Sequence, residues 1–474
     1  MTKKVYKYRS HTQFDVVIVG SGPAGVHAAY PLTEAGLQVA IIDGGLDSKK
    51  RTSKPVNFSE TDSSTAGHAY DLLRKSSYVF YKTYQLLKIK SDIEIIQSLA
   101  KGGLSEIWDG ICDFFSKEEL EKIGLPADII QQEYQEVAKL INLKLKIPLD
   151  THGRLILQSA KNKANLKNTV YQLPTAISYR ASSSIEDLKR FKNFTYIPNQ
   201  LVYTVKDKIE YVEIQSFSID NSVMSTNRAN YLILAAGSVN TTRILLRSLG
   251  LFDYRTTFLT KAHFLTACLN FRTLTKKTNS KKSNFGQLAI LSDETYHGLV
   301  AFFVQLYRFN TEVLHKSLKY IPLPKVIASM LLSFIISSLV IADIRFPVFE
   351  SKNKFCRLLK KGDEDVLEIS YKENRKELEI HRNEVNKISR QLRSLGLLPL
   401  KTVSDYVTVH YAGGVPFREV PTLLSVDKNG KLHQTNRIYS GDSSTWKALP
   451  AKSPTLTIMA NARRVGKNVL RKFN

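Results

Sequence analysis

The sequence predicts an α/β fold, in which a Rossmann-like domain with a parallel sheet is joined to a substrate-facing domain of antiparallel strands. Three observations support this prediction. A strand, a glycine-rich turn, a helix and a second strand follow one another over residues 14–43. A similar strand, turn and helix recur at 229–246, and aromatic and basic strands follow over residues 251–405. Returning strand–helix units are what a doubly wound sheet requires.

The first glycine-rich turn indicates a dinucleotide site. An apolar run at 16–19 leads into Gly20, Gly22 and Gly25, which have the G-x-G-x-x-G spacing, and a helix-compatible segment follows. Gly20 permits the tight turn, Gly22 lets the backbone approach a pyrophosphate, and Gly25 lets the helix pack on the strand. The phosphates are then expected at the amino terminus of the helix. The alternative is a glycine-rich turn without a ligand.

The second strand strengthens the dinucleotide prediction. It covers residues 39–42 and ends in Asp43, an acid expected to bond a ribose hydroxyl. Pro31 lies inside the predicted helix and is expected to kink or end it, since proline lacks the backbone N–H. Gly36 then provides a stop before the second strand.

Composition describes a globular chain of 474 residues, 43% of them hydrophobic, which is long enough for two or more domains. The cysteines Cys112, Cys268 and Cys356 are scattered and show no C-x-x-C spacing. This argues against a disulfide framework and a structural zinc site, and it suits a reducing compartment. Residues 1–10 are basic but lack an apolar core, so we expect no secretory signal and a cytoplasmic location.

The charge predicts an anionic partner. Lys and Arg total 68 against 43 Asp and Glu, which gives a net charge of +25. Nucleic acid, an acidic membrane surface and an anionic substrate would each complement this excess. No nucleic-acid-binding motif is present, so we do not expect a nucleic-acid partner. A basic surface without a function is the alternative.

Three further stretches extend the pattern. Paired glycines with a serine and a tryptophan at 102–108 indicate backbone pressed against a flat ligand, or an ordinary turn with a core tryptophan. Charged, helical patterns from residue 116 to 140 indicate a departure from the dinucleotide domain. Residues 194–218 alternate apolar and polar in short runs, which is typical of exposed antiparallel strands.

The longest apolar run covers residues 326–342, about 17 residues. It is marginal for a spanning helix, which needs about 20 apolar residues. Ser329, Ser333 and Ser337 are four apart and would share one helical face. The run is consistent with a buried helix, a segment lying in a membrane interface or a transmembrane helix. The flanking cations that would hold an interfacial segment are Lys319, Lys325, Arg345, Lys352 and Lys354.

His410 is the candidate catalytic residue. It ends a predicted strand beside the glycine turn at 413–414. Histidine titrates near neutrality, so His410 could accept a proton from a substrate hydroxyl. A structural histidine is the alternative.

The motifs together resemble the glucose-methanol-choline flavin oxidoreductase family. The resemblance rests on GSGPAG at 20–25, GGLSEIW at 102–108, LAAGSVNTTRILL at 234–246, HYAGG at 410–414 and YSGDSSTW…SPTLTIMANARR at 439–464. It covers nearly the whole chain except residues 251–400. It implies FAD as cofactor and an FAD-binding domain interleaved with the substrate domain. The implied segments are 1–115, 191–250 and 405–474 for the FAD-binding domain, 116–190 for a cap segment and 251–404 for the substrate domain.

The resemblance also implies a set of cofactor-binding residues. Gly20, Gly22 and Gly25 would hold the pyrophosphate, and Asp43 the adenosine ribose. Gly102, Gly103, Ser105 and Trp108 would pass along the isoalloxazine. The remaining implied residues are Pro23, Ala24, Gly44, Val202, Ala235, Ala236, Gly237, Gly441, Asp442, Pro454 and Thr455.

The implied reaction is alcohol oxidation, with His410 assisting removal of the hydroxyl proton while hydride goes to flavin N5. Ser453 stands where the family usually has Asn or His, and it can still donate and accept a hydrogen bond. Ile107 stands where relatives with covalent FAD have a histidine, so we predict non-covalent FAD.

Three functions are consistent with these features. The first is an FAD-dependent dehydrogenase or oxidase acting on a sugar-like or lipid-linked alcohol, at a membrane surface reached through 326–342. The second is a flavin-dependent reductase or isomerase of a polyprenyl or steroid substrate, and the third is a non-catalytic flavoprotein. The sequence identifies no electron acceptor.

Overall fold

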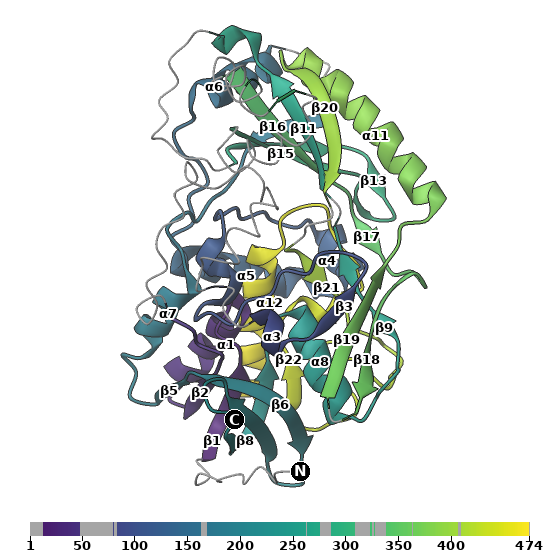
Figure 1. The fold of residues 1–474 in the computed structure, drawn as a ribbon. Helices are drawn as coiled ribbons and strands as arrows, with labels where there is room; N and C mark the ends of the chain where they lie inside the picture. The colour runs from purple at the N-terminus through teal and green to yellow at the C-terminus, as the bar shows by residue number, and fades with distance from the viewer. Residues whose placement is uncertain are drawn as a thin grey trace.

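The computed structural model describes residues 13–47, 79, 83–162, 168–261, 263–274, 286–308, 323–324, 327, 338–362, 364–405 and 409–473. Helices and several sheets form one elongated molecule with a parallel sheet at one end and an antiparallel sheet at the other (Figure 1). The predicted mixed α/β fold is confirmed.

The first sheet has seven strands in the order β5-β2-β1-β8-β7-β6, and β22 pairs with the end of β8. Strands β5, β2, β1, β8 and β22 are parallel, whereas β7 and β6 are antiparallel to their neighbours. The strands come from three separate stretches of the chain. They are β1 (Gln13–Val19), β2 (Val39–Ile42), β5 (Phe194–Ile197), β6 (Gln200–Asp207), β7 (Val212–Ser218), β8 (Met224–Leu234) and β22 (Ile438–Ser440).

Both faces of this sheet are buried, which explains the apolar run in β1. Val16 and Ile18 face a core shared with several helices, while Val17 and Val19 face a second core on the side of α8 (Ser238–Ser248). The helices of the first core include α1 (Pro23–Glu34), α5 (Ala127–Leu140), α7 (Ala181–Leu188) and α12 (Thr455–Leu470). Gly466 lets α12 approach α1, since a Cβ there would lie 2.4 Å from the Ala28 carbonyl oxygen.

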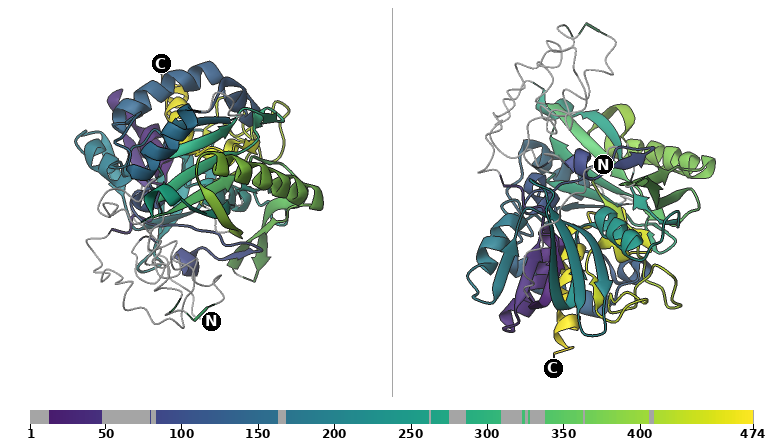
Figure 2. Two further views of the ribbon diagram at one scale, coloured as in Figure 1. Left: turned by 90° about the horizontal axis from the view of Figure 1, so that it is seen from above. Right: turned by 60° about the horizontal axis from the view of Figure 1, so that its bottom comes forward.

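The second sheet is antiparallel, in the order β20-β11-β16-β15-β12-β4. Helix α11 (Arg375–Ser394) lies along its outer face (Figure 2), where its buried residues Val385, Ile388 and Leu392 join the sheet's core. The strands are β4 (Asn168–Gln172), β11 (His263–Leu269), β12 (Leu288–Ser292), β15 (Phe303–Arg308), β16 (Leu339–Arg345) and β20 (Leu398–Asp405).

Smaller elements connect the two sheets. A four-stranded sheet has the order β3-β19-β18-β9, and three strand pairs are β10-β21, β13-β14 and β17-β23. Their bounds are β3 (Ile89–Ser91), β9 (Thr256–Thr257), β10 (Leu259–Thr260), β13 (Thr295–Tyr296), β14 (Leu299–Val300), β17 (Val348–Phe349), β18 (Lys354–Lys361), β19 (Glu364–Tyr371), β21 (Tyr411–Ala412) and β23 (Ala448–Leu449). The remaining helices are α3 (Thr83–Leu86), α4 (Lys117–Ile123) and α6 (Thr151–Lys161), with 3₁₀ turns η4 (Gly103–Ile107), η5 (Phe271–Thr273) and η7 (Ser443–Thr445).

Most predicted elements are present, and the differences have physical causes. Pro31 does not end α1, which continues to Glu34. Strand β5 is parallel to β2, so the prediction of antiparallel strands is wrong for residues 194–197 and holds for β6 and β7. The sequence did not predict helix α11, because this helix is mostly charged and has few apolar residues that would show a helical period.

The end of the long apolar run is also different from the prediction. Leu339 to Ala342 form part of β16 at the centre of the antiparallel sheet, so a helical interpretation is wrong for these residues. Residues 328–337 lie outside the described part of the chain, together with Lys319 and Lys325. Two of the supposed flanking cations are buried in ion pairs instead: Arg345 with Asp343, and Lys354 with Glu377. Among the described residues, no helix is long and apolar enough to cross a membrane.

Candidate functional site

A cavity of about 660 Å³ lies at the carboxyl ends of the parallel strands and extends to the antiparallel sheet. This edge is where open α/β sheets bind ligands. Two ends of the cavity differ in chemistry. We call the walls formed by residues 19–24, 42–44 and 235–240 the glycine end. The polar end is formed by His263, Gln305, Asp343, Arg345, His410 and Ser453.

The three glycines of the first turn have different surroundings. A Cβ on Gly20, whose φ is +103°, would lie 2.5 Å from the Ala235 carbonyl oxygen. A Cβ on Gly25 would lie 1.8 Å from the Gly20 carbonyl oxygen. A Cβ on Gly22 would have no atom within 4 Å, because Gly22 lines the cavity. Gly20 and Gly25 therefore allow the turn and helix to pack, while Gly22 leaves open space for a ligand.

Three helices begin at the cavity wall: α1 after Gly22, α8 after Gly237 and α12 after Pro454. None of these three helices has a side chain that caps its amino terminus. The first backbone N–H groups of a helix lack partners within the helix, and the helix dipole makes this end positive. The site therefore offers hydrogen-bond donors and positive potential to a negatively charged ligand.

Asp43, at the end of β2, is held by the glycine turn. Its carboxylate accepts hydrogen bonds from the Ser21 hydroxyl (2.5 Å), the Tyr196 hydroxyl (3.0 Å) and the Gly45 amide (2.9 Å). Burial raises its pKa, and these hydrogen bonds oppose that shift. The Ser21 hydroxyl also accepts from the Gly102 amide (2.9 Å). Ser21 therefore joins the glycine turn, the β2 end and the start of η4.

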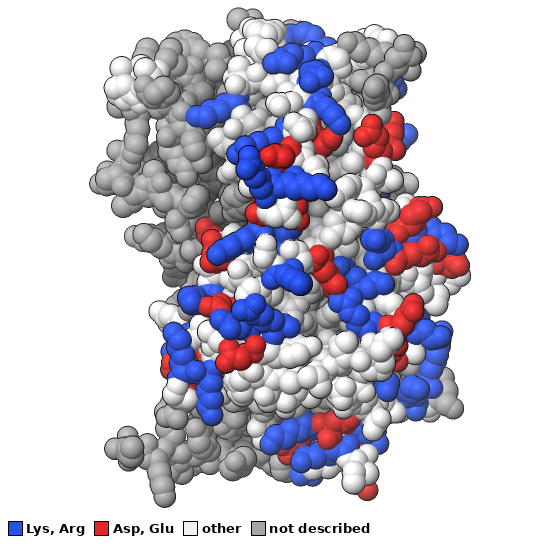
Figure 3. Space-filling view, turned by 90° about the vertical axis from the view of Figure 1, so that its right-hand side faces the viewer, with Lys and Arg blue, Asp and Glu red and all other residues white. Residues whose placement is uncertain are grey.

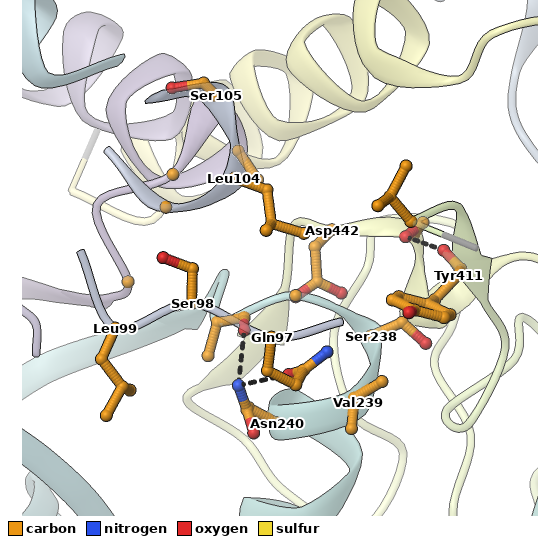
Figure 4. A pocket seen from close by; sticks show the side chains of 18 of the residues that line it. Gln97, Ser98, Leu99, Leu104, Ser105, Ser238, Val239, Asn240, Tyr411 and Asp442 are labelled. Carbon is orange, nitrogen blue, oxygen red and sulfur yellow. Dashed lines mark hydrogen bonds between the residues drawn. The ribbon is translucent and has the colours of Figure 1, made fainter. Parts of the chain in front are cut away.

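Residues 97–109 form another wall. The Gln97 and Asn240 side chains point toward each other and share a 2.9 Å hydrogen bond (Figure 4). Ser105 donates to the Gly102 carbonyl oxygen (2.7 Å) and accepts from the Ala181 amide (2.9 Å), so its hydroxyl is used within the protein. Trp108 lines the cavity with its ring edge-on to Tyr179.

Asp442 connects β22 to η7 at the cavity wall. It is 2% exposed, accepts from the Thr241 hydroxyl (2.6 Å) and caps η7 through the Ser444 amide (2.9 Å). Burial raises its pKa, and the hydrogen bonds oppose this. Asp442 therefore joins the last part of the chain to α8.

The polar end is built on the antiparallel sheet. His263 pairs with Arg345 across β11 and β16, and Gln305 pairs with Asp343 across β15 and β16. Asp343 lies 3.0 Å from His263 Nδ1 and 2.5 Å from Arg345 Nη2. Burial opposes ionisation of Asp343, but the charge of Arg345 and the hydrogen bonds from Arg345 and His263 outweigh it and hold the pKa of Asp343 below the ordinary range.

His410 lies next to this cluster, with its ring centre 6.2 Å from that of His263. Burial lowers the pKa of His410 well below its ordinary value, and the nearby charges of Lys261 and Arg345 lower it further. His410 is therefore neutral at pH 7. The buried Lys261 ammonium donates to the carbonyl oxygens of Pro450 (2.9 Å), Ala451 (3.2 Å) and Lys452 (2.7 Å), which fixes the backbone leading into Ser453.

The cavity brings together most of the residues expected from the sequence. These are Gly20, Gly22, Pro23, Ala24, Asp43, Gly44, Gly103, Ser105, Trp108, Val202, Ala235, Ala236, Gly237, His410, Asp442, Ser453, Pro454 and Thr455. Gly25, Gly102 and Gly441 lie behind the wall. A Cβ on Gly441 would lie 3.3 Å from Ile233, so it packs under β8.

No sequence motif predicts the cluster of His263, Gln305, Asp343 and Arg345. Its best signal was in β16, where Asp343 and Arg345 interrupt an otherwise apolar strand. Charged residues two apart on a strand share a face, and buried charges are rare unless they are paired. The prediction that Arg345 flanks a membrane segment is wrong, because Arg345 is 6% exposed and ion-paired at the cavity.

The surface charge is mixed on the face shown in Figure 3. Lysines and arginines alternate there with aspartates and glutamates, and the described residues of this face form no large region of one sign. This face therefore gives no support to a single basic surface that would bind an anionic partner.

Comparison with known families identifies the ligand that the glycine end binds. Residues 15–52 match the family model described as an FAD binding domain. A comparison with curated proteins finds no match. The matched segment contains most of β1, the glycine turn, α1 and β2. FAD is therefore the cofactor, and the chain is a flavin-dependent oxidoreductase. The open space at Gly22 and the uncapped helix termini fit the anionic pyrophosphate of FAD.

Proposed function

We propose that the protein is an FAD-dependent dehydrogenase or oxidase of the glucose-methanol-choline type, which oxidises a CH–OH group of a sugar-like or lipid-linked alcohol. The observation that carries the proposal is that His410 and Ser453 line the same cavity as the glycine turn. The residues 409–411 and 453–455 reach this cavity from different elements of the carboxyl-terminal part. A donor–acceptor pair near a flavin is what removal of a hydroxyl proton requires.

The proposed arrangement of domains follows the two sheets. Segments 1–115, 191–250 and 405–474 would form the FAD-binding domain, and 251–404 the substrate domain, with 116–190 as a cap segment. Gly20, Gly22 and the amino terminus of α1 would hold the pyrophosphate, and Asp43 the ribose. Trp108 and residues 235–237 would border the flavin. When bound, FAD supplies the acceptor for hydride from the carbinol carbon.

His410 is the proposed base. Because burial and nearby cations hold its pKa well below the ordinary value, its ring is neutral at pH 7 and can accept the hydroxyl proton. The rate of alcohol oxidation is therefore expected to be independent of pH from neutrality upward and to fall only in acid. A rate that rises through pH 7–8 would contradict this assignment.

The test is anaerobic reduction of the bound flavin. Purified protein is mixed with sugars, sugar alcohols and long-chain alcohols, and loss of the visible flavin absorbance is recorded. We expect at least one alcohol to bleach the wild-type flavin and His410→Gln to slow this by about 10²–10⁴-fold. Flavin content, measured in the same samples, controls for loss of cofactor. Failure of every alcohol would contradict the proposed function.

One measurement separates this proposal from the reductase alternative. A flavin that is reduced by NADH or NADPH and reoxidised by a polyprenyl or steroid double bond would favour the reductase.

FAD is proposed to be non-covalent, because Ile107 offers no attachment atom. Acid precipitation should then release the yellow flavin into the supernatant, and flavin that stays with the precipitate would contradict non-covalent binding.

A further inference from the structure

The polar end contains a hydrogen-bond network with a fixed direction. The Arg345 guanidinium donates to the Asp343 carboxylate (2.5 Å and 3.0 Å), to Gln305 Oε1 (2.9 Å) and to Ser453 Oγ (3.3 Å). A guanidinium can only donate hydrogen bonds. Every group that contacts Arg345 in these bonds must therefore act as an acceptor toward it.

Asp343 fixes the orientation of the Arg345 guanidinium. It is 3% exposed and contacts both His263 Nδ1 and Arg345. Burial disfavours its charged form, but the Arg345 guanidinium and the hydrogen bond from His263 hold the pKa low and keep it ionised. An ionised carboxylate only accepts, so His263 Nδ1 carries a hydrogen and Arg345 cannot turn away without leaving the buried charge unpaired.

The consequence falls on Ser453. Its hydroxyl oxygen accepts from Arg345 Nη1, so its own hydrogen must point elsewhere. Ser453 borders the cavity, and the backbone before it is fixed by the three bonds from Lys261. The hydroxyl hydrogen is thus available to an acceptor in the cavity, which His410 also lines.

We propose that Arg345, held by Asp343, is a positioning residue that makes Ser453 a hydrogen-bond donor to the substrate oxygen. The inference rests on the proposed alcohol oxidation. As His410 takes the hydroxyl proton, the O–H bond breaks and negative charge grows on the substrate oxygen. A preorganised donor aimed at that oxygen stabilises this charge. Ser453 then does not compete with His410 for the proton.

A double-mutant cycle tests the inference. The limiting rate of anaerobic flavin reduction, with the alcohol that reduces the wild type, is measured for Ser453→Ala, Arg345→Met and the double variant. If Arg345 acts through Ser453, each single variant is expected to lose about 10²-fold in rate, as for removal of one donor to a developing oxyanion. The double variant should then lose no more than either single variant.

Two further variants keep the test decisive. Arg345→Lys retains a cationic donor and is expected to recover part of the rate; it replaces Arg345→Met in the cycle if that variant does not bind flavin. Arg464→Met is the matched control, since Arg464 is a buried arginine of α12 that bonds Asn461 and the Lys428 carbonyl oxygen away from the cavity. It should lower stability and leave the rate of flavin-loaded protein unchanged.

The outcomes distinguish the inference from the proposed function. Losses that multiply in the double variant, or an unchanged rate in Arg345→Met, would overturn the inference alone. A wild-type flavin that no alcohol reduces would overturn the proposed function and the inference together.

Discussion

The two ends of the cavity differ in whether backbone or side chains form the wall. At the glycine end the wall is backbone: Gly20, Gly22 and Gly237 lie at the carboxyl edge of the parallel sheet, and helices begin there without side-chain caps. At the polar end the wall is side chains, where Asp343 and Arg345 project from the antiparallel sheet. Substitutions that add volume should therefore be most damaging at the glycine end, and substitutions that remove a charge should be most damaging at the polar end.

The largest effect is expected from volume at Gly25. A Cβ there would lie 1.8 Å from the Gly20 carbonyl oxygen, which belongs to the turn and cannot move aside like a flexible side chain. Overpacking in a well-packed region commonly costs about 1–3 kcal/mol, and a backbone clash should exceed this. Gly25→Ala should therefore give little folded, flavin-loaded protein, as measured by thermal unfolding and flavin content. A stable holoprotein would show that α1 can shift from β1.

The next effect is expected from charge at Asp343. Asp343→Asn leaves the buried Arg345 without its carboxylate, and breaking a buried ion pair costs about 3–5 kcal/mol. Chemical denaturation should show this loss at pH 7. The folded pKa of Asp343 is depressed, so its stabilisation is present above the unfolded value of about 3.9 and is lost as the pH falls through the folded pKa.

The pH dependence provides the control for that measurement. The difference in free energy of unfolding between wild type and Asp343→Asn should be constant near neutrality and shrink in acid, below about pH 4. A difference that is the same at pH 3 and pH 7 would mean that Asp343 acts by packing and not by charge.

The same contrast explains what the sequence could predict. The glycine end follows from local spacing, because the turn, the ligand approach and the helix packing each require glycine at a fixed position within six residues. The polar end joins His263, Gln305, Asp343, Arg345 and Ser453, which meet only through strand register and the approach of the α12 amino terminus. Register between distant strands is not encoded in any short motif. The charged residues two apart in β16 are visible in the sequence, but the apolar residues around them favoured a helix.

A smaller effect is expected at Asp43. Asp43→Asn removes the carboxylate proposed to bond the ribose and disturbs the bonds from Ser21 and Tyr196. A hydrogen bond to a charged group contributes about 1.5–3 kcal/mol, so FAD affinity should fall by about 10- to 100-fold. Equilibrium titration of the apoprotein with FAD measures this. Tyr196→Phe, which removes one donor and keeps the carboxylate, should weaken binding less; equal losses would place the effect in the Tyr196 hydrogen bond.

The smallest effect on stability is expected at Gly22, where the two roles of a glycine can be separated. Its φ is −65°, and a Cβ meets no atom within 4 Å, so Gly22→Ala should fold with unchanged thermal stability in the absence of FAD. The added methyl group would occupy the space that we assign to the pyrophosphate, and FAD affinity should fall by about tenfold, or about 1.4 kcal/mol. FMN lacks the AMP half of FAD, so the loss should be larger for FAD than for FMN. Unchanged FAD affinity would mean that the pyrophosphate does not pass Gly22. In that case the open space there would have another occupant, while the packing roles of Gly20 and Gly25 would stand.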